Sequence, residues 1–231
     1  MYQYIKRVLD LIIAVILMII FLIPMIIIGI LIKFDSKGPV FFKQERTGKN
    51  GKIFKVYKFR SMAIDNDVHD FNKKDQHTKV GTILRKLSLD ELPQLINIIR
   101  GEMSFIGPRP WIPDYYENMT EYQRHRNDVL PGITGLAQAK GRNNINILEK
   151  INYDLEYVKN YSFIQDVKIF FLTIKTVLSK EGADAGKGTI QTELETLIAN
   201  EKEYQNNKKL ENNDSNEVNQ QAWKKYYSQQ R

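Results

Sequence analysis

An uncharged apolar stretch of 22 residues, from Leu11 to Ile32, constrains this chain more than any other feature of its sequence. At about 1.5 Å per residue, a helix over the stretch would be roughly 33 Å long, which is enough to cross the hydrocarbon core of a bilayer. A signal peptide is excluded, because the run is too long and has no small-residue cleavage site. A helix buried in a protein core is the alternative, and we expect a membrane helix.

Pro24 lies inside the stretch, and basic residues lie on both sides of it. Proline removes one backbone hydrogen bond, so a kink is expected, although spanning helices also tolerate proline. The flanking cations are Lys6, Arg7, Lys33, Lys37 and Lys43. They favour neither end under the positive-inside rule. Two basic flanks fit best if both ends of residues 1–34 face the cytoplasm, as in a re-entrant membrane helix. The charges and the proline alone leave a straight crossing equally open.

The charge of the chain is unevenly distributed. The 231 residues include 34 Lys and Arg against 27 Asp and Glu, which gives a net charge of +7. Residues 1–180 carry 27 basic and 18 acidic side chains (+9), whereas residues 181–231 carry 7 and 9 (−2). A basic body indicates an anionic partner, such as nucleic acid, a phosphate-rich metabolite or anionic lipid.

Several classes of site are excluded by residue types that the sequence lacks. Cysteine is absent, which excludes a disulfide scaffold, a thiolate zinc site and a cysteine nucleophile. The histidines do not have metal-ligand spacing, and the G-x-S-x-G pattern of a serine nucleophile is missing. The sequence contains neither a Walker loop nor a kinase signature, so ATP is not the expected phosphoryl donor.

The segment from Val40 to Met62 is predicted to form a β-hairpin. Two alternating apolar runs flank Asn50 and Gly51, a strong signal for a two-residue turn. Most of the many lysines and arginines in the segment are expected on a solvated strand face. Lys58 and Arg60 differ, because they lie where the hairpin ends and could point into a site.

The rest of the chain is predicted to be mainly helical. Helices are expected over 79–87, over an apolar run that ends at Arg100, and over 114–126, 145–159 and 163–180. The last of these is very apolar, so it belongs either in the core or on the bilayer surface. We expect residues 35–182 to form a cytoplasmic catalytic domain. Residues 183–231 are expected to form a polar tail with a short helix, partly disordered.

Asp90 and Glu91 are the candidate catalytic pair. Ser88 and Glu91 match a capping box, so a purely structural role in a first helical turn is the alternative. Pro93 argues against a helix that begins at Ser88, because it would remove an intrahelical bond. If the regular helix starts nearer Pro93, both acids lie on its entry turn, where phosphate binds well.

Cations around the pair could clamp a diphosphate, because the guanidinium fork matches phosphate geometry. The candidates are Lys58, Arg60, Arg85, Arg109 and Arg142. Two adjacent carboxylates among cations suit phosphoryl transfer with Mg²⁺, in which one acid can attack phosphorus while the other holds the metal.

Four motifs of the sequence resemble those of the bacterial sugar transferases, small monotopic phosphoglycosyl transferases. The resemblance covers residues 1–180 and leaves the tail uncovered. The motifs are Lys58-Phe59-Arg60-Ser61-Met62, Leu89-Asp90-Glu91-Leu92-Pro93-Gln94-Leu95, the segment from Gly101 to Pro110, and the segment from Pro131 to Gln138. The fold that the resemblance implies is a small α/β unit: a re-entrant membrane helix, a small β-hairpin and several interfacial helices.

The resemblance also implies an activity at the cytoplasmic face of the inner membrane. The enzyme would transfer a sugar 1-phosphate from a UDP-sugar to polyprenyl phosphate, release UMP, and so begin the assembly of a surface glycan. Asp90 aligns with the family's nucleophile and Glu91 with its magnesium-binding acid. The family's re-entrant helix breaks at a Ser-Pro pair, where this chain has Ile23 and Pro24. The phospholipid bilayer, a homo-oligomer and downstream glycosyltransferases are the further partners that it implies.

A membrane-tethered basic protein that binds nucleic acid or anionic lipid is the alternative function. The basic hairpin offers the aromatic side chains Phe54, Tyr57 and Phe59, on which bases of a single strand could stack. However, the sequence contains no recognisable nucleic-acid-binding motif, and the rigid Gly107–Pro110 segment is unusual for a groove reader. We therefore expect no nucleic acid among the partners.

Overall fold

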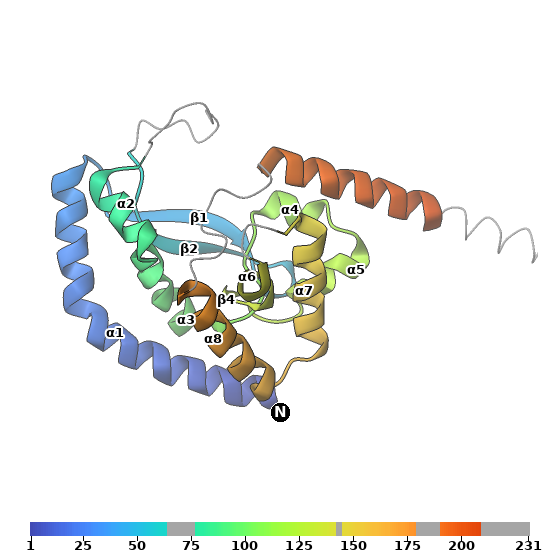
Figure 1. The fold of residues 1–231 in the computed structure, drawn as a ribbon, viewed down its shortest axis with the longest axis horizontal. Coiled ribbons are helices and arrows are strands. Elements are labelled where there is room, and N and C mark those ends of the chain that lie inside the picture. The colour runs from blue at the N-terminus through green and yellow to red at the C-terminus, as the bar shows by residue number, and fades with distance from the viewer. Residues whose placement is uncertain (64–76, 142–144, 179–189, 209–231) are drawn as a thin grey trace, which may run out of the picture.

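The structure is a computed structural model that describes residues 1–63, 77–141, 145–178 and 190–208. Its first element is the 34-residue helix α1 (Tyr2–Asp35), with Pro24 inside it. Figure 1 shows α1 as a bent helix that curves around one side of the body. The kink expected from the proline therefore agrees with the shape of the helix.

Both ends of α1 pack on the body, while its middle is exposed. Its buried residues are Lys6, Asp10, Ala14, Ile28 and Ile32. Between them, Ile19, Ile20 and Ile23 are at least half exposed. Of the most apolar 18-residue window, only 11% is buried, so α1 is not the core helix of a soluble protein. In the described part of the chain, α1 is the one helix that is long and apolar enough to cross a membrane.

The predicted hairpin is present as β1 (Phe41–Thr47) and β2 (Ile53–Phe59), paired antiparallel. Its connection is longer than the two-residue turn that the sequence indicates. The backbone N–H of Gly48 donates to the carbonyl of Lys52, and a 3₁₀ turn, η1 (Lys49–Gly51), lies between them. Asn50 and Gly51 still supply the two positive φ angles, 55° and 75°, that make the chain reverse.

Three short helical elements follow the hairpin: α2 (Lys79–Lys86), the 3₁₀ turn η2 (Leu89–Gln94) and α3 (Leu95–Arg100). Asn97 on α3 is fully buried and fixes this layer to β2. Its amide accepts from the backbone N–H of Tyr57 and donates to the carbonyl of Lys55. One buried polar side chain thus sets the position of η2 relative to the hairpin.

A two-stranded parallel sheet joins the motif over residues 101–110 to the motif over residues 131–138. Its strands are β3 (Ser104–Ile106) and β4 (Gly132–Thr134). A Cβ on Gly132 would lie 2.2 Å from the backbone nitrogen of Gly107, and one on Gly135 would lie 2.2 Å from the Gly107 carbonyl oxygen. These glycines are required because the two backbones touch, and that contact fixes where the segment after Gly107 leaves the sheet.

The single helix expected over 114–126 is wrong. The structure has α4 (Pro113–Glu117), α5 (Glu121–Arg124) and the 3₁₀ turn η3 (His125–Asn127). The break occurs because Thr120 and Gln123 form a capping box that begins a new helix. The remaining elements are α6 (Leu136–Gly141), α7 (Ile147–Lys159) and α8 (Phe163–Leu178).

Residues 190–208 form a further helix, which we call the tail helix. In Figure 1 it lies at the side of the body that carries α4, α5 and α7, away from α1. Leu197 is completely buried there among residues of α4 and α7. The helix over residues 190–208 is therefore docked on the body.

Candidate active site

Asp90 and Glu91 lie on η2, the 3₁₀ turn that precedes α3 and packs against β2. The capping-box interpretation of these acids is wrong. Ser88 has a left-handed backbone (φ 56°) and makes no side-chain capping bond, and the regular α-helix begins only at Leu95. Pro93 is accommodated because the turn is not α-helical.

Glu91 is the acid that the surrounding cations contact. The Lys58 ammonium donates to Glu91 Oε1 at 2.6 Å, and an Arg109 guanidinium nitrogen lies 3.4 Å from the same oxygen. Burial by itself raises the pKa of Glu91, but the charges of Arg109 and Lys58 outweigh it, so the pKa lies below its ordinary value. Burial lowers the pKa of Lys58, and Glu91 opposes that shift. Glu91 is therefore ionised at neutral pH.

The pKa of Asp90 is shifted upward, opposite to that of Glu91. Burial raises its pKa above the ordinary value, the charge of Lys58 lowers it, and the neighbouring Glu91 charge raises it further. Arg85 also lowers it, and a guanidinium nitrogen of Arg85 lies 3.1 Å from His77 Nε2. The two adjacent carboxylates thus have pKa values that are pushed apart, which is typical of two acids with different roles.

Arg46 also belongs to this site, although the hairpin pattern predicts a solvated strand face for most of its basic residues. It is half-buried on β1. Together with residues from four other segments, it lines a small cleft beside Asp90 and Glu91. The cleft is lined by Arg46, Val56, Lys58, Gln94, Arg109, Pro110 and Gly132. Burial, and then the charge of Arg109, lowers the pKa of Arg46 to about 10. We call Lys58, Arg46, Arg85, Arg109, Asp90 and Glu91 the site cluster.

Arg109 is held by Arg126, a residue that lies outside the four sequence motifs. A guanidinium nitrogen of Arg126 donates to the Arg109 carbonyl at 2.7 Å, and Arg126 is itself paired with Asp154 at 2.7 Å. Arg126 is 1% exposed and lies over the ring of Trp111, 3.8 Å from its centroid. The backbone of the Gly107–Pro110 segment is therefore fixed by a buried ion pair.

The structure does not bring Arg60 into the site cluster. Arg60 is buried, and its guanidinium donates to the carbonyls of Ser36 and Lys37 just after α1. It thereby ties the end of the hairpin to the end of the membrane helix. Arg142, the remaining predicted phosphate-binding residue, lies outside the described residues.

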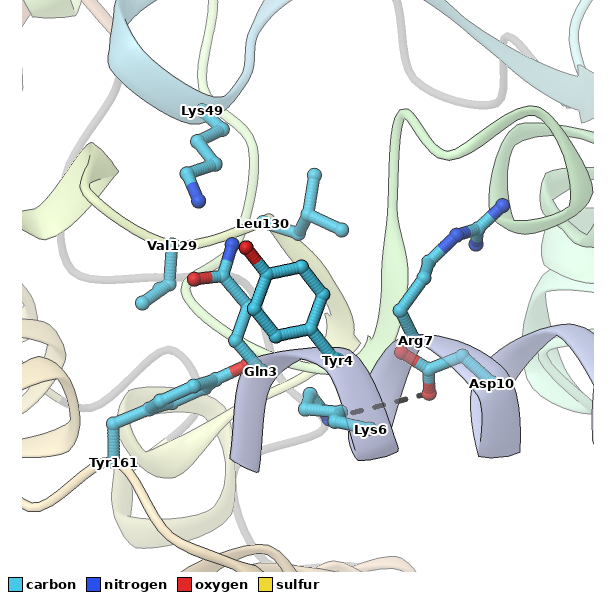
Figure 2. A pocket seen from close by; sticks show the side chains of 9 residues that line it. All are labelled: Gln3, Tyr4, Lys6, Arg7, Asp10, Lys49, Val129, Leu130 and Tyr161. Carbon is cyan, nitrogen blue, oxygen red and sulfur yellow. Dashed lines mark ion pairs between the residues drawn. The ribbon is translucent and has the colours of Figure 1, made fainter. Parts of the chain in front are cut away.

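Another cavity lies elsewhere, at the start of α1 (Figure 2). It measures about 210 Å³ and is lined by Gln3, Tyr4, Lys6, Arg7, Asp10, Lys49, Val129, Leu130 and Tyr161. Two of its cations already bind protein groups. Lys6 pairs with Asp166 at 2.6 Å, and Arg7 donates to the carbonyls of Ile98 and Ile99. This cavity is therefore not the candidate active site.

The residues present fit a divalent cation shared with a substrate. No group of three or more metal-binding side chains occurs within the described residues. Mg²⁺ does not need one, because it is commonly held by one or two carboxylates together with substrate phosphates and water. Glu91 is ionised, and both of the cations that contact it do so through Oε1. Glu91 is thus suited to hold the metal, which would offset phosphate charge there.

A long apolar helix wrapped around a small α/β body, with a cation-rich carboxylate site, is the arrangement of a membrane-associated enzyme that acts on an anionic substrate. A family model described as "Bacterial sugar transferase" matches residues 1–180. The chain belongs to this family. The tail helix lies outside the matched region.

The chain is similar to curated relatives of two different lengths. It is 44% identical over 179 residues to an uncharacterized sugar transferase EpsL of Bacillus subtilis, which covers 77% of this chain and 89% of the relative. It is 40% identical to the exopolysaccharide production protein ExoY of Sinorhizobium fredii, with 77% and 87% covered. It is 43% identical to the UDP-glucose:undecaprenyl-phosphate glucose-1-phosphate transferase of Klebsiella pneumoniae over 73% of this chain, but over only 39% of that longer protein.

Proposed function

We propose that this chain transfers a sugar 1-phosphate from a UDP-sugar to polyprenyl (undecaprenyl) phosphate and releases UMP, as the first membrane step of surface-glycan assembly. The observation that carries the proposal is the site cluster, in which two adjacent carboxylates face an excess of cations. The name of the Klebsiella pneumoniae relative, which states a UDP-sugar and undecaprenyl phosphate, supports the same chemistry.

The charges of the site cluster match a diphosphate donor. Its four cations and two carboxylates leave a net charge of about +2, and a sugar nucleotide carries one negative charge on each of its two phosphates. Arginine and lysine in a partly buried cleft bind such oxygens strongly, because the local dielectric is lower than that of water. Lys58, Arg46 and Arg109 line the same cleft and would bind the diphosphate.

In the mechanism that we propose, a carboxylate oxygen of Asp90 attacks the phosphorus that bears the sugar. The bond from that phosphorus to the bridging oxygen breaks, and UMP leaves with the bonding electrons. An oxygen of polyprenyl phosphate then attacks the same phosphorus, which releases the Asp90 carboxylate and forms the lipid-linked diphosphosugar. Glu91 remains ionised and anchors Lys58 and Arg109, while bound Mg²⁺ would neutralise charge on the donor.

We also propose that α1 enters and leaves the bilayer on the same side, the cytoplasmic face of the inner membrane. The support is that both ends of the helix are fixed to one body. Near the first end, Lys6 pairs with Asp166 at 2.6 Å. At the other end, the Asp35 carboxylate accepts from the backbone N–H of Val80 at 2.9 Å. A straight crossing would separate the two ends by the thickness of the bilayer.

Exposed apolar side chains on other elements support a monotopic position on the lipid surface. The outer side of α8 carries several, and two more lie on α2 and on the residue that caps its end; Figure 1 shows these helices near opposite ends of α1. They are Phe163, Ile164, Phe170, Phe171, Ile83 and Leu87, each more than half exposed. Such a surface is stable against lipid and unfavourable in water. The helix over 163–180 was expected in the core or on the bilayer, and its exposed face favours the bilayer.

The nucleic-acid alternative is less well supported, because the hairpin aromatics are not free to stack on bases. Phe59 is 2% exposed. Phe54 packs against a core cluster of residues from β2, α3 and α1. The ring of Tyr57 is covered by Lys43 and Arg100, whose charged groups lie 5.4 and 5.1 Å from its centroid.

The activity is tested by assaying UMP release from a panel of UDP-sugars, with the purified chain in lipid vesicles, Mg²⁺ and polyprenyl phosphate. We expect release from at least one donor, together with a radiolabelled lipid product that contains the sugar phosphate. A matched reaction with the sugar 1-phosphate in place of the UDP-sugar should give no product. Failure of every donor to release UMP above the protein-free background would contradict the proposal.

The topology is tested with single cysteines, since the natural chain has none. Gln3→Cys and Lys37→Cys place one thiol at each end of α1, both at exposed positions. In intact cells, both should resist a membrane-impermeant thiol reagent and react after permeabilisation. If one end reacts from outside while the other does not, the helix crosses the membrane.

A further inference from the structure

The tail helix is docked on the body by a buried apolar contact, although it lies beyond the region that the family model matches. Leu197 is 0% exposed, whereas the next residue, Ile198, is 36% exposed. Leu197 packs, with Leu194 beside it, into a cluster formed by Tyr115, Met119, Ile147 and Ile151. The helix therefore covers a core surface that α4 and α7 would otherwise expose to water.

Polar contacts fix the register of the tail helix. Glu193 accepts from the Tyr115 hydroxyl at 2.7 Å through one oxygen and from the Lys150 ammonium at 2.6 Å through the other. Asn200 accepts from the side-chain amide of Gln123 at 2.7 Å. Burial, and then the bond to Glu193, raises the pKa of Tyr115. Contacts on three successive turns hold the helix in one position.

The residues that the tail helix touches lead directly to the site cluster. The ring of Tyr115 lies 5.4 Å from that of Trp111, centroid to centroid. Trp111 lies under the guanidinium of Arg126, which donates to the Arg109 carbonyl at 2.7 Å. Arg109 in turn lies 3.4 Å from Glu91. Every step of this path is a direct contact.

Helix α7 supports both ends of the path with one face. Ile147, Lys150 and Ile151 contact the tail helix, and Asp154, one turn further, pairs with Arg126. Positions separated by three or four residues share a helix face. By contrast, α4 has only five residues, too few to be stable without tertiary contacts. Its position therefore depends on α7 and the tail helix together.

We propose that the tail helix is a positioning element for Arg109. By holding Tyr115 and α4 against α7, it keeps Trp111 and Arg126 in place, and these fix the backbone that presents Arg109 to the donor diphosphate. Leu197 and Glu193 are then positioning residues for donor binding, and they touch no reacting atom. This inference rests on the proposed function for the role of Arg109, while the docking of the helix does not.

Two aspartate substitutions in the full-length chain test the inference. Leu197→Asp places a charge in the buried contact and should undock the helix, whereas Ile198→Asp places the same charge at an exposed neighbouring position. We expect Leu197→Asp to raise KM for the UDP-sugar by about tenfold and to leave KM for polyprenyl phosphate within about twofold. Ile198→Asp should change neither constant by more than about twofold.

Fluorescence of Trp111 gives a readout that does not need activity. The chain has two tryptophans, so Trp223→Phe leaves Trp111 as the only one. In that background, Leu197→Asp should make Trp111 more accessible to acrylamide, and Ile198→Asp should not. Leu197→Ala, which removes packing without adding charge, provides a milder version if the aspartate variant does not fold. It should give smaller changes in the same direction.

The outcomes separate this inference from the proposed function. If the unmodified chain releases no UMP from any donor, the proposed function fails, and Trp111 quenching still tests whether the helix is docked. An unchanged donor KM in both Leu197 variants would overturn the inference. So would a loss of kcat with both KM values unchanged, because that pattern indicates a general loss of folded enzyme.

Discussion

Two groups of charged residues in this protein are built in opposite ways. The first is the site cluster on β1, β2, η2 and the Gly107–Pro110 segment. The second, which we call the foot cluster, joins the start of α1 to α7 and α8 and consists of Tyr2, Lys6, Tyr157 and Asp166. In the foot cluster, one carboxylate oxygen of Asp166 accepts hydrogen bonds from the Lys6 ammonium at 2.6 Å and from the Tyr2 hydroxyl. The other oxygen accepts from the Tyr157 hydroxyl at 2.7 Å.

The difference lies in what remains unpaired. In the foot cluster, both carboxylate oxygens of Asp166 are bound by protein donors, and Lys6 and Asp166 are buried. In the site cluster, the cations outnumber the carboxylates, Arg109 is 47% exposed along its side chain, and both contacts to Glu91 converge on one oxygen. A balanced cluster holds elements together, whereas a cation-rich, open cluster can bind an anion.

The largest effect should follow from Glu91→Gln, because it removes the charge that both cations contact and the proposed metal ligand. We expect kcat/KM for the donor to fall by about a thousandfold, or about 4 kcal/mol, and the Mg²⁺ concentration needed for half-maximal rate to rise. Initial rates of UMP release over a Mg²⁺ titration measure both. Glu45→Gln, at an exposed position on β1, is the matched control and should be within about twofold of the unmodified chain.

A smaller effect of a different kind should follow from Asp166→Asn in the foot cluster. Removing the carboxylate leaves Lys6 buried with only Asp10, 4.0 Å away. We expect a loss of about 3 kcal/mol in the free energy of unfolding, visible as a Tm lower by about 10 °C in detergent. The folded fraction should keep its donor KM. A donor KM that rises as strongly as in a site-cluster variant would remove the distinction between the clusters.

The smallest effect should be a shift of the pH profile in Arg85→Gln. Asp90 must be ionised to attack phosphorus. The value of kcat is therefore highest at pH values above the pKa of Asp90 and decreases as the pH falls through that pKa. The charge of Arg85 lowers the pKa of Asp90, so its removal should move the acid limb upward by about half a pH unit. The measurement is kcat against pH, with Lys86→Gln as the neighbouring control. A downward shift would contradict the electrostatics described here.

The elements and residues that the sequence predicts correctly are those with local signals. The apolar stretch predicts α1, alternation with Asn50 and Gly51 predicts the hairpin, and Pro93 indicates that the regular helix starts late. The sequence also groups Lys58, Arg60, Arg85, Arg109 and Arg142 around Asp90 and Glu91, and in the structure Lys58 and Arg109 contact Glu91. Each depends on the chemistry of a few neighbouring residues, which sequence spacing reports well.

The residues that sequence reasoning placed differently all owe their roles to tertiary contacts. Arg46 and Arg60 are both basic residues of the hairpin segment. The packing of β1 against the Arg109 segment brings Arg46 into the site. Arg60 instead donates to a backbone carbonyl just after the end of α1. Arg126 has its role through Asp154, which is distant in sequence. A local signal for the break between α4 and α5 was available, since Thr120 and Gln123 have capping-box spacing.

The central claim, that Asp90 is a covalent nucleophile, is tested most directly by omitting the acceptor. Purified chain with Mg²⁺ and a reactive UDP-sugar, but without polyprenyl phosphate, should release about one UMP per active site and then stop. The sugar phosphate should remain on the protein in a form that hydroxylamine cleaves, and Asp90→Asn should abolish the burst. Release of UMP only when polyprenyl phosphate is present, or a normal burst in Asp90→Asn, would contradict the account.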